Sequence, residues 1–190
     1  MKRECIAIGN VLREHGGLPC AGLEIMRHII SILLQNEAGA LARVANLFSS
    51  RGYNIESLNV APTADPTISR LTLVTTGENP IIEQITKQLG KLVDVVEIAD
   101  MTSADHIERE LALFKLRVAN GDAAKLTSVL EQFDARVLSD TQDQYTVEIV
   151  GGSQEIDRFL KRVAGITDII TLVRSGAMAV SRGASVLERG

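Results

Sequence analysis

Apolar and polar residues along this chain follow two successive rounds of strand and helix patterns. The first round begins at residues 28–34 (HIISILL), an apolar run with β-branched residues that predicts a buried strand. The next apolar residues recur at i, i+3, i+4 and i+7 and predict one helix face: Leu41, Val44, Ala45 and Phe48. Gly52 follows where a left-handed C-terminal cap would lie.

The remainder of the first round predicts three strands and a second helix. Residues 55–62 (IESLNVAP) and 67–75 (TISRLTLVT) resemble strands, joined by a turn at residues 63–66. Pro80 marks the start of a helix, whose inward residues are Ile82, Ile85 and Leu89. Residues 92–99 (LVDVVEIA) form the last strand. The order β-α-β-β-α-β indicates a ferredoxin-like unit.

After a polar stretch, the same order repeats. The predicted elements are strand 110–118, helix 123–133, strands 135–140 and 145–150, helix 153–163 and strand 167–173. The spacing of Leu126, Val129 and Phe133 matches that of the first helix. We therefore predict an α+β protein of two tandem βαββαβ ferredoxin-like units. The expected divisions are a leader (1–25), a first domain (26–99), a linker (100–109) and a second domain with its tail (110–190).

Each unit is expected to carry its helices on one face of its sheet. The strands of the first unit are too apolar for the other face to be left in water; the candidates for that face include Ile30, Ile32, Leu71 and Leu73. Because exposed apolar patches of that size mark interfaces, we expect a homodimer through sheets or edge strands. The last stretch, residues 174–190, reads either as a helix or as a mobile tail.

Composition narrows the classes of function. A net charge of -4 and 3% aromatic residues argue against nucleic-acid binding, which calls for a basic face or stacking platforms. No apolar run approaches the ~18 residues that a membrane span needs, so we expect a soluble, cytoplasmic protein. Cys5 and Cys20 both lie in the leader, which excludes a disulfide framework or cysteine metal site in the folded part. The leader lacks a signal-peptide pattern, and we expect it to be disordered.

No catalytic constellation or nucleotide motif emerges from the sequence. The three histidines are scattered, with His106 in the predicted linker. Glu108 and Glu110 share one face of a strand, and we expect them to be solvated rather than an acid–base pair.

The start of the first predicted helix has the features of a ligand-binding site. Asn36 follows the first strand and Gly39 precedes the first helical turn, where unpaired N–H groups can hold a carboxylate. The Asn36 amide oxygen is a possible acceptor for an ammonium group. Asn54 begins the next strand and is expected to face the same area. These features predict an α-amino-acid site, although turn and cap chemistry alone also explains them.

Residues 26–183 resemble the small regulatory subunit of acetolactate synthase. The segments that carry the resemblance are NEAGALARVANLFSSRGYNIESLNVAPT, DPTISRLTL, IEQITKQLGKLVDVVEI and VRSGAMAVSRG. The resemblance implies that the first domain is an ACT domain that dimerises and binds valine at the dimer interface. The implied binding residues are Asn36, Gly39 and Asn54, with Leu34, Ala38, Ala40 and Ile55 as wall candidates.

The resemblance also implies a non-enzymatic role. The chain would activate a large catalytic subunit that carries thiamine diphosphate, FAD and magnesium, hold no cofactor or metal itself, and confer inhibition by valine. The implied contact with that subunit is the turn that contains Pro62, Thr63, Asp65, Pro66 and Arg70. Two alternatives stay open: a free-standing amino-acid sensor with another partner, and a small enzyme built on ferredoxin-like units, which would need a titratable cluster in a cleft.

Overall fold

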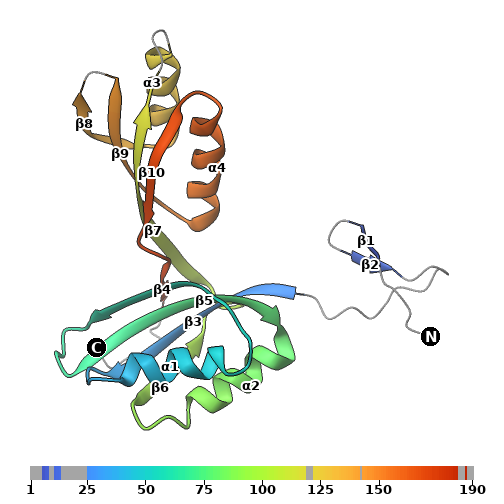
Figure 1. Ribbon diagram of the computed structural model, residues 1–190. Coiled ribbons are helices and arrows are strands. Elements are labelled where there is room, and N and C mark those ends of the chain that lie inside the picture. Colours follow the sequence, from blue (N-terminus) through green and yellow to red (C-terminus); the bar gives the residue numbers. More distant parts are fainter. Residues whose placement is uncertain are drawn as a thin grey trace.

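The structure, a computed structural model, describes residues 6–8, 11–13, 25–118, 122–141, 143–183 and 187. Figure 1 shows two sheet-and-helix units, one above the other, and a short hairpin to one side. The hairpin pairs β1 (Ile6–Ile8) with β2 (Val11–Arg13) in antiparallel fashion. Apart from these strands and residue 25, the leader, which was expected to be disordered, lies outside the described residues. Cys5 and Cys20 lie outside the described residues.

The first unit has the predicted order of elements. They are β3 (Ile25–Gln35), α1 (Ala40–Ser49), β4 (Ile55–Pro62), β5 (Ile68–Glu78), α2 (Asn79–Leu89) and β6 (Val95–Asp100). The four strands form an antiparallel sheet in the order β4-β5-β3-β6. Both helices lie on one face of this sheet (Figure 1). The strands β4 and β6 are thus its edges.

The core of the first unit lies between this sheet and the two helices. The inward residues of α2 are those predicted, Ile82, Ile85 and Leu89. On α1 they are Ala40, Val44 and Phe48, whereas Leu41 is 40% exposed. Of the predicted apolar face of α1, Val44 and Phe48 thus point inward, Ala45 is half-buried, and Leu41 does not belong to it.

The strand residues expected on the uncovered face lie in this core instead. Ile30, Ile32, Leu71 and Leu73 are fully buried and pack against Val44, Phe48 and the inward residues of α2. The apolar run of β3 is buried along both faces, so its sequence does not show which alternate residues meet the helices. That part of the prediction is wrong.

The second unit repeats the arrangement. Its elements are β7 (His106–Arg117), α3 (Ala123–Gln132), β8 (Arg136–Thr141), β9 (Gln144–Gly151), α4 (Ser153–Ala164), β10 (Asp168–Arg174) and β11 (Met178–Ser181). The strand order is β10-β7-β9-β8, and β11 also pairs with β7. At the centre of its core, Phe159 meets Phe114 and Phe133 edge to face, with ring centroids 5.0 and 5.4 Å apart. Such contacts contribute about 0.5–1.5 kcal/mol each beyond area burial.

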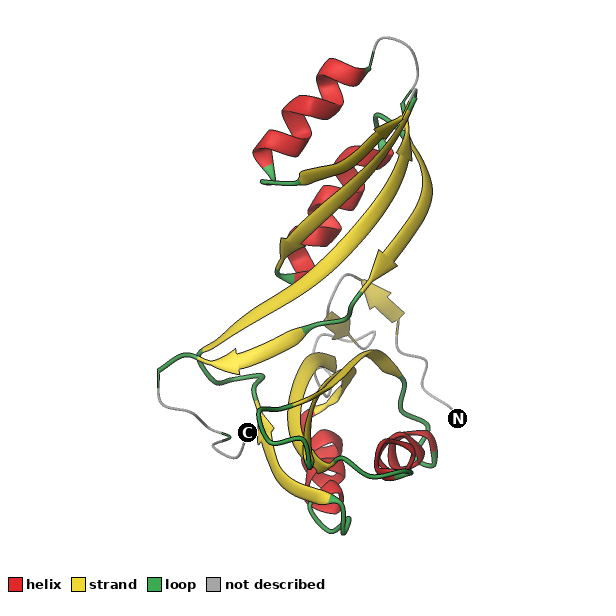
Figure 2. Cartoon of the chain, turned by 90° about the vertical axis from the view of Figure 1, so that its left-hand side faces the viewer, coloured by secondary structure: helices red, strands yellow, loops and turns green. Residues whose placement is uncertain are grey.

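The long strand β7 joins the units. The 12 residues of β7 span about 40 Å at ~3.3 Å per residue, and Figure 2 shows this sheet reaching down to the first unit. Residues 106–109, expected to be linker, pair with β11, and the upper part of β7 pairs with β9 and β10. The linker prediction is therefore wrong for these four residues.

The chain returns to the first unit after β10, and this return covers the second face of the first sheet. Part of the stretch left open as helix or tail is a strand, β11. Ala177, Ala179 and Leu187 bury their side chains against Ile29, Leu33 and other residues on the side of the sheet away from α1 and α2. The chain itself thus covers part of the apolar back of the first sheet.

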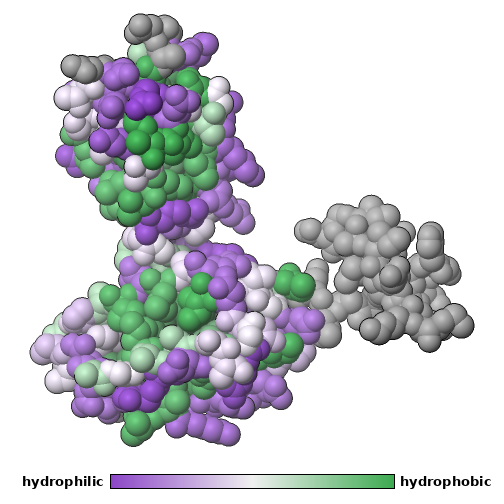
Figure 3. Space-filling model, viewed as in Figure 1, coloured by the Kyte–Doolittle hydropathy of each residue, from purple (hydrophilic) through white to green (hydrophobic). Residues whose placement is uncertain are grey.

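The two units meet at a narrow waist. Figure 3 shows two masses joined there, with hydrophilic residues gathered at the base of the upper one.

Within the described part of the chain, no helix is long and apolar enough to cross a membrane.

Candidate functional site

The loop between β3 and α1 presents the start of a helix with its backbone donors free. Gly39 is the N-cap, with a left-handed φ of 89°, and no side chain caps the helix. Arg43 N–H donates to the Gly39 carbonyl oxygen at 3.0 Å, which is the first helical bond. Gly39 is suited to this position because other residues adopt a positive φ only at a cost. The sequence prediction of a helix that starts just after Gly39 is confirmed.

The free donors are the N–H groups of Leu41 and Ala42. No hydrogen bond among the described residues engages either of them. The first turn also contains no acidic residue, and the one carboxylate paired close to it, that of Asp94, is engaged by Arg43. This arrangement is chemically suited to an external carboxylate.

Arg43 fixes this helix start to the rest of the unit. Its guanidinium forms a bidentate ion pair with Asp94, in which Nη2 donates to Oδ1 at 2.7 Å and Nε donates to Oδ2. Asp94 is buried, and the Arg43 guanidinium holds the pKa of its carboxyl below the ordinary value. A Cβ on Gly39 would lie 3.0 Å from Arg43 Nη1. The ion pair therefore lies directly over the N-cap.

We expect Asp94→Asn to lower the free energy of unfolding at pH 7 and to lose this effect in acid. A depressed pKa in the folded state stabilises the fold above the unfolded pKa, near 3.8, and this stabilisation disappears as pH falls through the folded value. Urea denaturation of wild type and Asp94→Asn at pH 7 and at a series of pH values below 3.8 measures the difference and its decline. Glu83→Gln, which removes only an exposed 3.9 Å pair with Lys87, is the control and should change little. If Asp94→Asn has the same free energy of unfolding as the wild type at pH 7, the prediction is contradicted.

Asn36 connects this loop to the turn between β4 and β5. Its side-chain Nδ2 donates to the Pro66 carbonyl oxygen at 2.9 Å, and its backbone N–H donates to the Thr67 carbonyl oxygen at 2.7 Å. The amide oxygen of the exposed Asn36 side chain is left as an acceptor. The amino-acid site and the partner-contact turn predicted from the sequence are thus hydrogen-bonded to each other.

The turn itself is held by its own polar groups. Asp65 Oδ1 accepts from the Thr67 backbone N–H at 2.9 Å and from Thr67 Oγ1 at 2.7 Å. Both bonds lower the pKa of the Asp65 carboxyl. Pro62, Asp65 and Pro66 are exposed and Thr63 is half-buried. These residues form a rigid, accessible surface at one end of the first sheet.

Arg70 differs from the other predicted contact residues. It lies on β5, half-buried, and its Nη2 donates to the Leu187 carbonyl oxygen at 3.1 Å. Its guanidinium thus binds the returning C-terminal segment, which periodicity did not predict.

The residues expected to line the walls of the amino-acid site differ in exposure. Ala38 is exposed beside Gly39, whereas Leu34 and Ala40 are only 2% and 3% exposed and belong to the core.

Asn54 and Ile55 lie at the other end of the sheet. Ile55 pairs with Thr75, and Thr75 pairs with His28 near the start of β3. Asn36 lies beyond the far end of that strand, roughly 25 Å away at ~3.3 Å per residue. The strand β5 also separates β4 from β3. The expectation that Asn54 faces the same area as Asn36 is wrong within one chain.

A polar cluster that was not foreseen lies at the base of the second unit, on the side of the first. Arg174 donates to both oxygens of Glu110, at 2.8 and 2.7 Å, and from Nη1 to Asp157 at 2.7 Å. These carboxylates raise the pKa of Arg174 above its ordinary value, against the effect of burial. Glu110 is 2% exposed. The expectation that Glu110 is solvated is therefore wrong.

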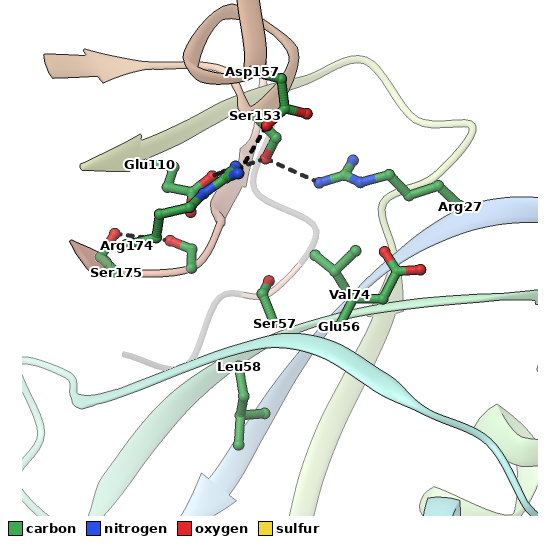
Figure 4. Close-up of a pocket in the computed structure, with 11 residues that line it drawn as sticks. Arg27, Glu56, Ser57, Leu58, Val74, Glu110, Ser153, Asp157, Arg174 and Ser175 are labelled. Carbon is green, nitrogen blue, oxygen red and sulfur yellow. Dashed lines mark hydrogen bonds and ion pairs between the residues drawn. The ribbon is translucent and has the colours of Figure 1, made fainter. Parts of the chain in front are cut away.

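Glu108 extends this cluster to the first unit. Its oxygens accept from Arg27 at 2.8 and 3.0 Å and from Ser153 Oγ at 2.5 Å. Burial alone would raise the pKa of Glu108, but Arg27 and Ser153 outweigh it and hold the pKa below its ordinary value. Figure 4 shows Arg27 and Ser153, with Glu110 and Arg174, around a cavity between the units. The shared strand face of Glu108 and Glu110 was readable from the sequence, but their arginine partners were not.

The described residues hold no group of three or more His, Cys, Asp or Glu side chains placed to bind a metal.

Comparison with known proteins covers both units. Residues 30–97 match a family model described as the AHAS small subunit-like ACT domain, and residues 109–183 match one described as the small subunit of acetolactate synthase. The Escherichia coli K12 acetolactate synthase isozyme 3 small subunit is 44% identical over 162 residues, 85% of this chain and 99% of the relative. The Haemophilus influenzae acetolactate synthase small subunit is 43% identical over 158 residues, 83% and 97% of the two chains.

A solved structure gives the same result for the fold. The crystal structure of the acetolactate synthase small subunit from Thermotoga maritima aligns with a TM-score of 0.75 and 31% sequence identity. The alignment covers 84% of this chain and 99% of that one. Both ferredoxin-like units predicted from the sequence are thus confirmed.

Proposed function

Because this chain belongs to the family of acetolactate synthase small subunits, we propose that it activates the catalytic subunit of that enzyme and makes it sensitive to valine. The observation that carries the proposal is the match of both units, with nearly the full length of the relatives covered. As a regulatory small subunit, the chain acts with a catalytic partner. Thiamine diphosphate, FAD and magnesium belong to that partner in this proposal, and both subunits act in the cytoplasm.

Valine would bind at the start of α1. Its carboxylate would accept from the free N–H groups of Leu41 and Ala42, and its ammonium group would donate to the Asn36 amide oxygen. The free donors and the absence of an acid in the first turn support this assignment. Gly39 has no side chain to cover the backbone, and its neighbours at this point are Ala38 and the Arg43 guanidinium.

A second copy of the chain would complete the site. The edge strand β4 pairs with β5 on one side and, among the described residues, with no strand on the other. If two β4 edges pair antiparallel across a twofold axis, Asn54 of one copy comes beside Pro62 of the other. Pro62 is level with Leu34, two strands away, so Asn54 would come within about 15 Å of the Asn36 loop, at ~4.8 Å per strand. The homodimer thus brings together residues that one chain keeps apart.

Binding at Asn36 would reach the catalytic subunit through the neighbouring turn. The Asn36 side chain that would hold the ammonium group also donates to Pro66 at 2.9 Å. A shift of this side chain on binding would therefore move the exposed turn that contains Pro62, Asp65 and Pro66. Valine acts as a switch in this scheme because its affinity differs between two positions of the turn.

We expect acetolactate formation by the cognate catalytic subunit to rise when this protein is added and to fall again when valine is added. The measurement is a titration of the catalytic subunit with this chain, with and without valine. Leucine and isoleucine serve as comparison effectors, since a pocket discriminates one methylene by about 1–3 kcal/mol. Activation without any response to valine would overturn the effector assignment. No activation would overturn the proposal and favour a free-standing amino-acid sensor.

A further inference from the structure

The chain between β10 and β11 lies directly on the edge strand of the first sheet. We name residues 175–177 the crossing segment. Within it, Gly176 has a left-handed φ of 78°, and a Cβ there would lie 3.3 Å from the Ser57 Cβ and 3.5 Å from the backbone N and O of Leu58. The second unit thus touches the backbone of β4 with no side chain between them.

Polar contacts accompany this close approach. The Ala177 N–H donates to Ser57 Oγ at 3.4 Å, and Asn59 Nδ2 donates to the Ser175 carbonyl oxygen at 3.4 Å. Ser175 Oγ in turn accepts from the Leu111 N–H on β7 at 3.0 Å. The crossing segment therefore bonds to β4 on one side and to the second unit on the other.

A second tie between the units is the ion pair of Arg27 with Glu108. Arg27 lies on β3 of the first unit, and Glu108 lies at the base of β7, where it also accepts from Ser153 at the start of α4. A displacement of β3 relative to the second unit would pull directly on this helix start.

Between the two ties lies a cavity of about 470 Å³. Figure 4 shows Ser57 and Leu58 on its lower side and Glu110, Ser153 and Arg174 on its upper side. The charged groups on the upper side already bond to one another. The cavity therefore offers few free polar groups to a ligand, but it leaves room for the units to move closer.

We propose that the contact of the crossing segment with β4, together with the Arg27–Glu108 ion pair, is the joint through which valine bound to the first unit repositions the second. The inference rests on the proposed function, because β4 is also the strand that begins after Asn54 and pairs with the second copy in that proposal. A valine that shifts β4 at the dimer interface moves the backbone on which Gly176 lies. By linkage, the position of the second unit must then affect the affinity for valine by the same factor, typically five- to 150-fold.

A reversible disulfide across the joint tests this inference. The Ser57→Cys/Gly176→Cys pair is suitable because the separation of the Cβ positions, 3.3 Å, is close to the ~3.5–4.5 Å of disulfides. Cys5→Ser and Cys20→Ser remove the native thiols from the background. Valine binding is measured by calorimetry, the response of α4 by hydrogen exchange with and without valine, and inhibition in the complex with the catalytic subunit. The Gly176→Cys single variant controls for strain at the left-handed position.

We expect the oxidised pair to bind valine with an affinity changed at least about fivefold, without a response of α4 and without inhibition. Reduction of the disulfide should restore the α4 response and the inhibition by valine. Full inhibition and a normal α4 response in the oxidised protein would overturn the inference, as would a pair that cannot be oxidised. A wild-type protein that binds no valine would overturn the proposed function and this inference together.

A second variant keeps the test independent of the engineered bond. Arg27→Gln breaks the other tie at an exposed position, 38% by side-chain exposure, and leaves the candidate valine site unchanged. Calorimetry should still detect valine binding, and the hydrogen-exchange response of α4 should shrink. An unchanged response would contradict the role of the ion pair.

Discussion

Gly39→Asp is expected to weaken valine binding by about 100-fold or more and to abolish inhibition while activation remains. The Asp side chain would place a carboxylate at the N-cap, where it can accept from the N–H groups that we assign to the carboxylate of valine. It would also repel that carboxylate directly. Because Asp caps helices well and tolerates a positive φ better than most residues, the fold should survive. Calorimetry with valine and the activation assay measure the two effects.

Two control variants separate charge from strain in this experiment. Gly39→Asn introduces the same shape without the charge and should lose much less affinity. Gly183→Asp adds an Asp at another left-handed glycine, with φ 84° and open space around it, and should bind valine normally. If Gly39→Asp binds valine within about threefold of the wild type, the candidate site at the start of α1 is wrong.

Arg174→Met is expected to lower the free energy of unfolding by about 3–5 kcal/mol. Removal of the guanidinium leaves the carboxylate of Glu110, 2% exposed, without its bidentate partner, and an uncompensated buried charge costs about this much. Urea denaturation at pH 7 measures the loss. Arg158→Met, at an exposed position of α4, is the matched control and should change the free energy by less than about 0.5 kcal/mol.

A compensating change tests the reason for this loss. Replacement of both partners, Arg174→Met with Glu110→Met, removes the buried charge together with its partner. Such double replacements of buried pairs are often neutral or stabilising, so we expect most of the lost stability to return. If the double variant is as unstable as Arg174→Met alone, the cost arises from packing of the Arg174 side chain and not from the unpaired charge.

Two of the predicted site residues show which positions could be predicted from the sequence and which could not. Gly39 was placed correctly at the helix start because the end of a strand, a glycine and an apolar helix face follow one another within a few residues. Within one chain, the expected nearness of Asn54 to Asn36 was wrong, because it depends on the order β4-β5-β3. The sequence distance of 18 residues between them says nothing about which end of the sheet each occupies.

The same distinction explains the polar cluster between the units. The alternation of β7 places Glu108 and Glu110 on one face, and the sequence shows this. Their partners Arg27 and Arg174 come from positions 81 and 64 residues away. No periodicity connects such positions, so the sequence favoured solvated carboxylates where the structure has ion pairs.

By itself, the sequence determined the two βαββαβ units, their helix starts and their family, because each depends on patterns within a few residues or on a resemblance along the chain. The tertiary structure alone decided that Ile30 and Ile32 face the helices, that Asn36 bonds to Pro66, and that the C-terminal strand covers the back of the first sheet. The physical reason is that local periodicity and turn chemistry fix each element. Contacts between elements depend instead on which distant surfaces the folded chain brings together.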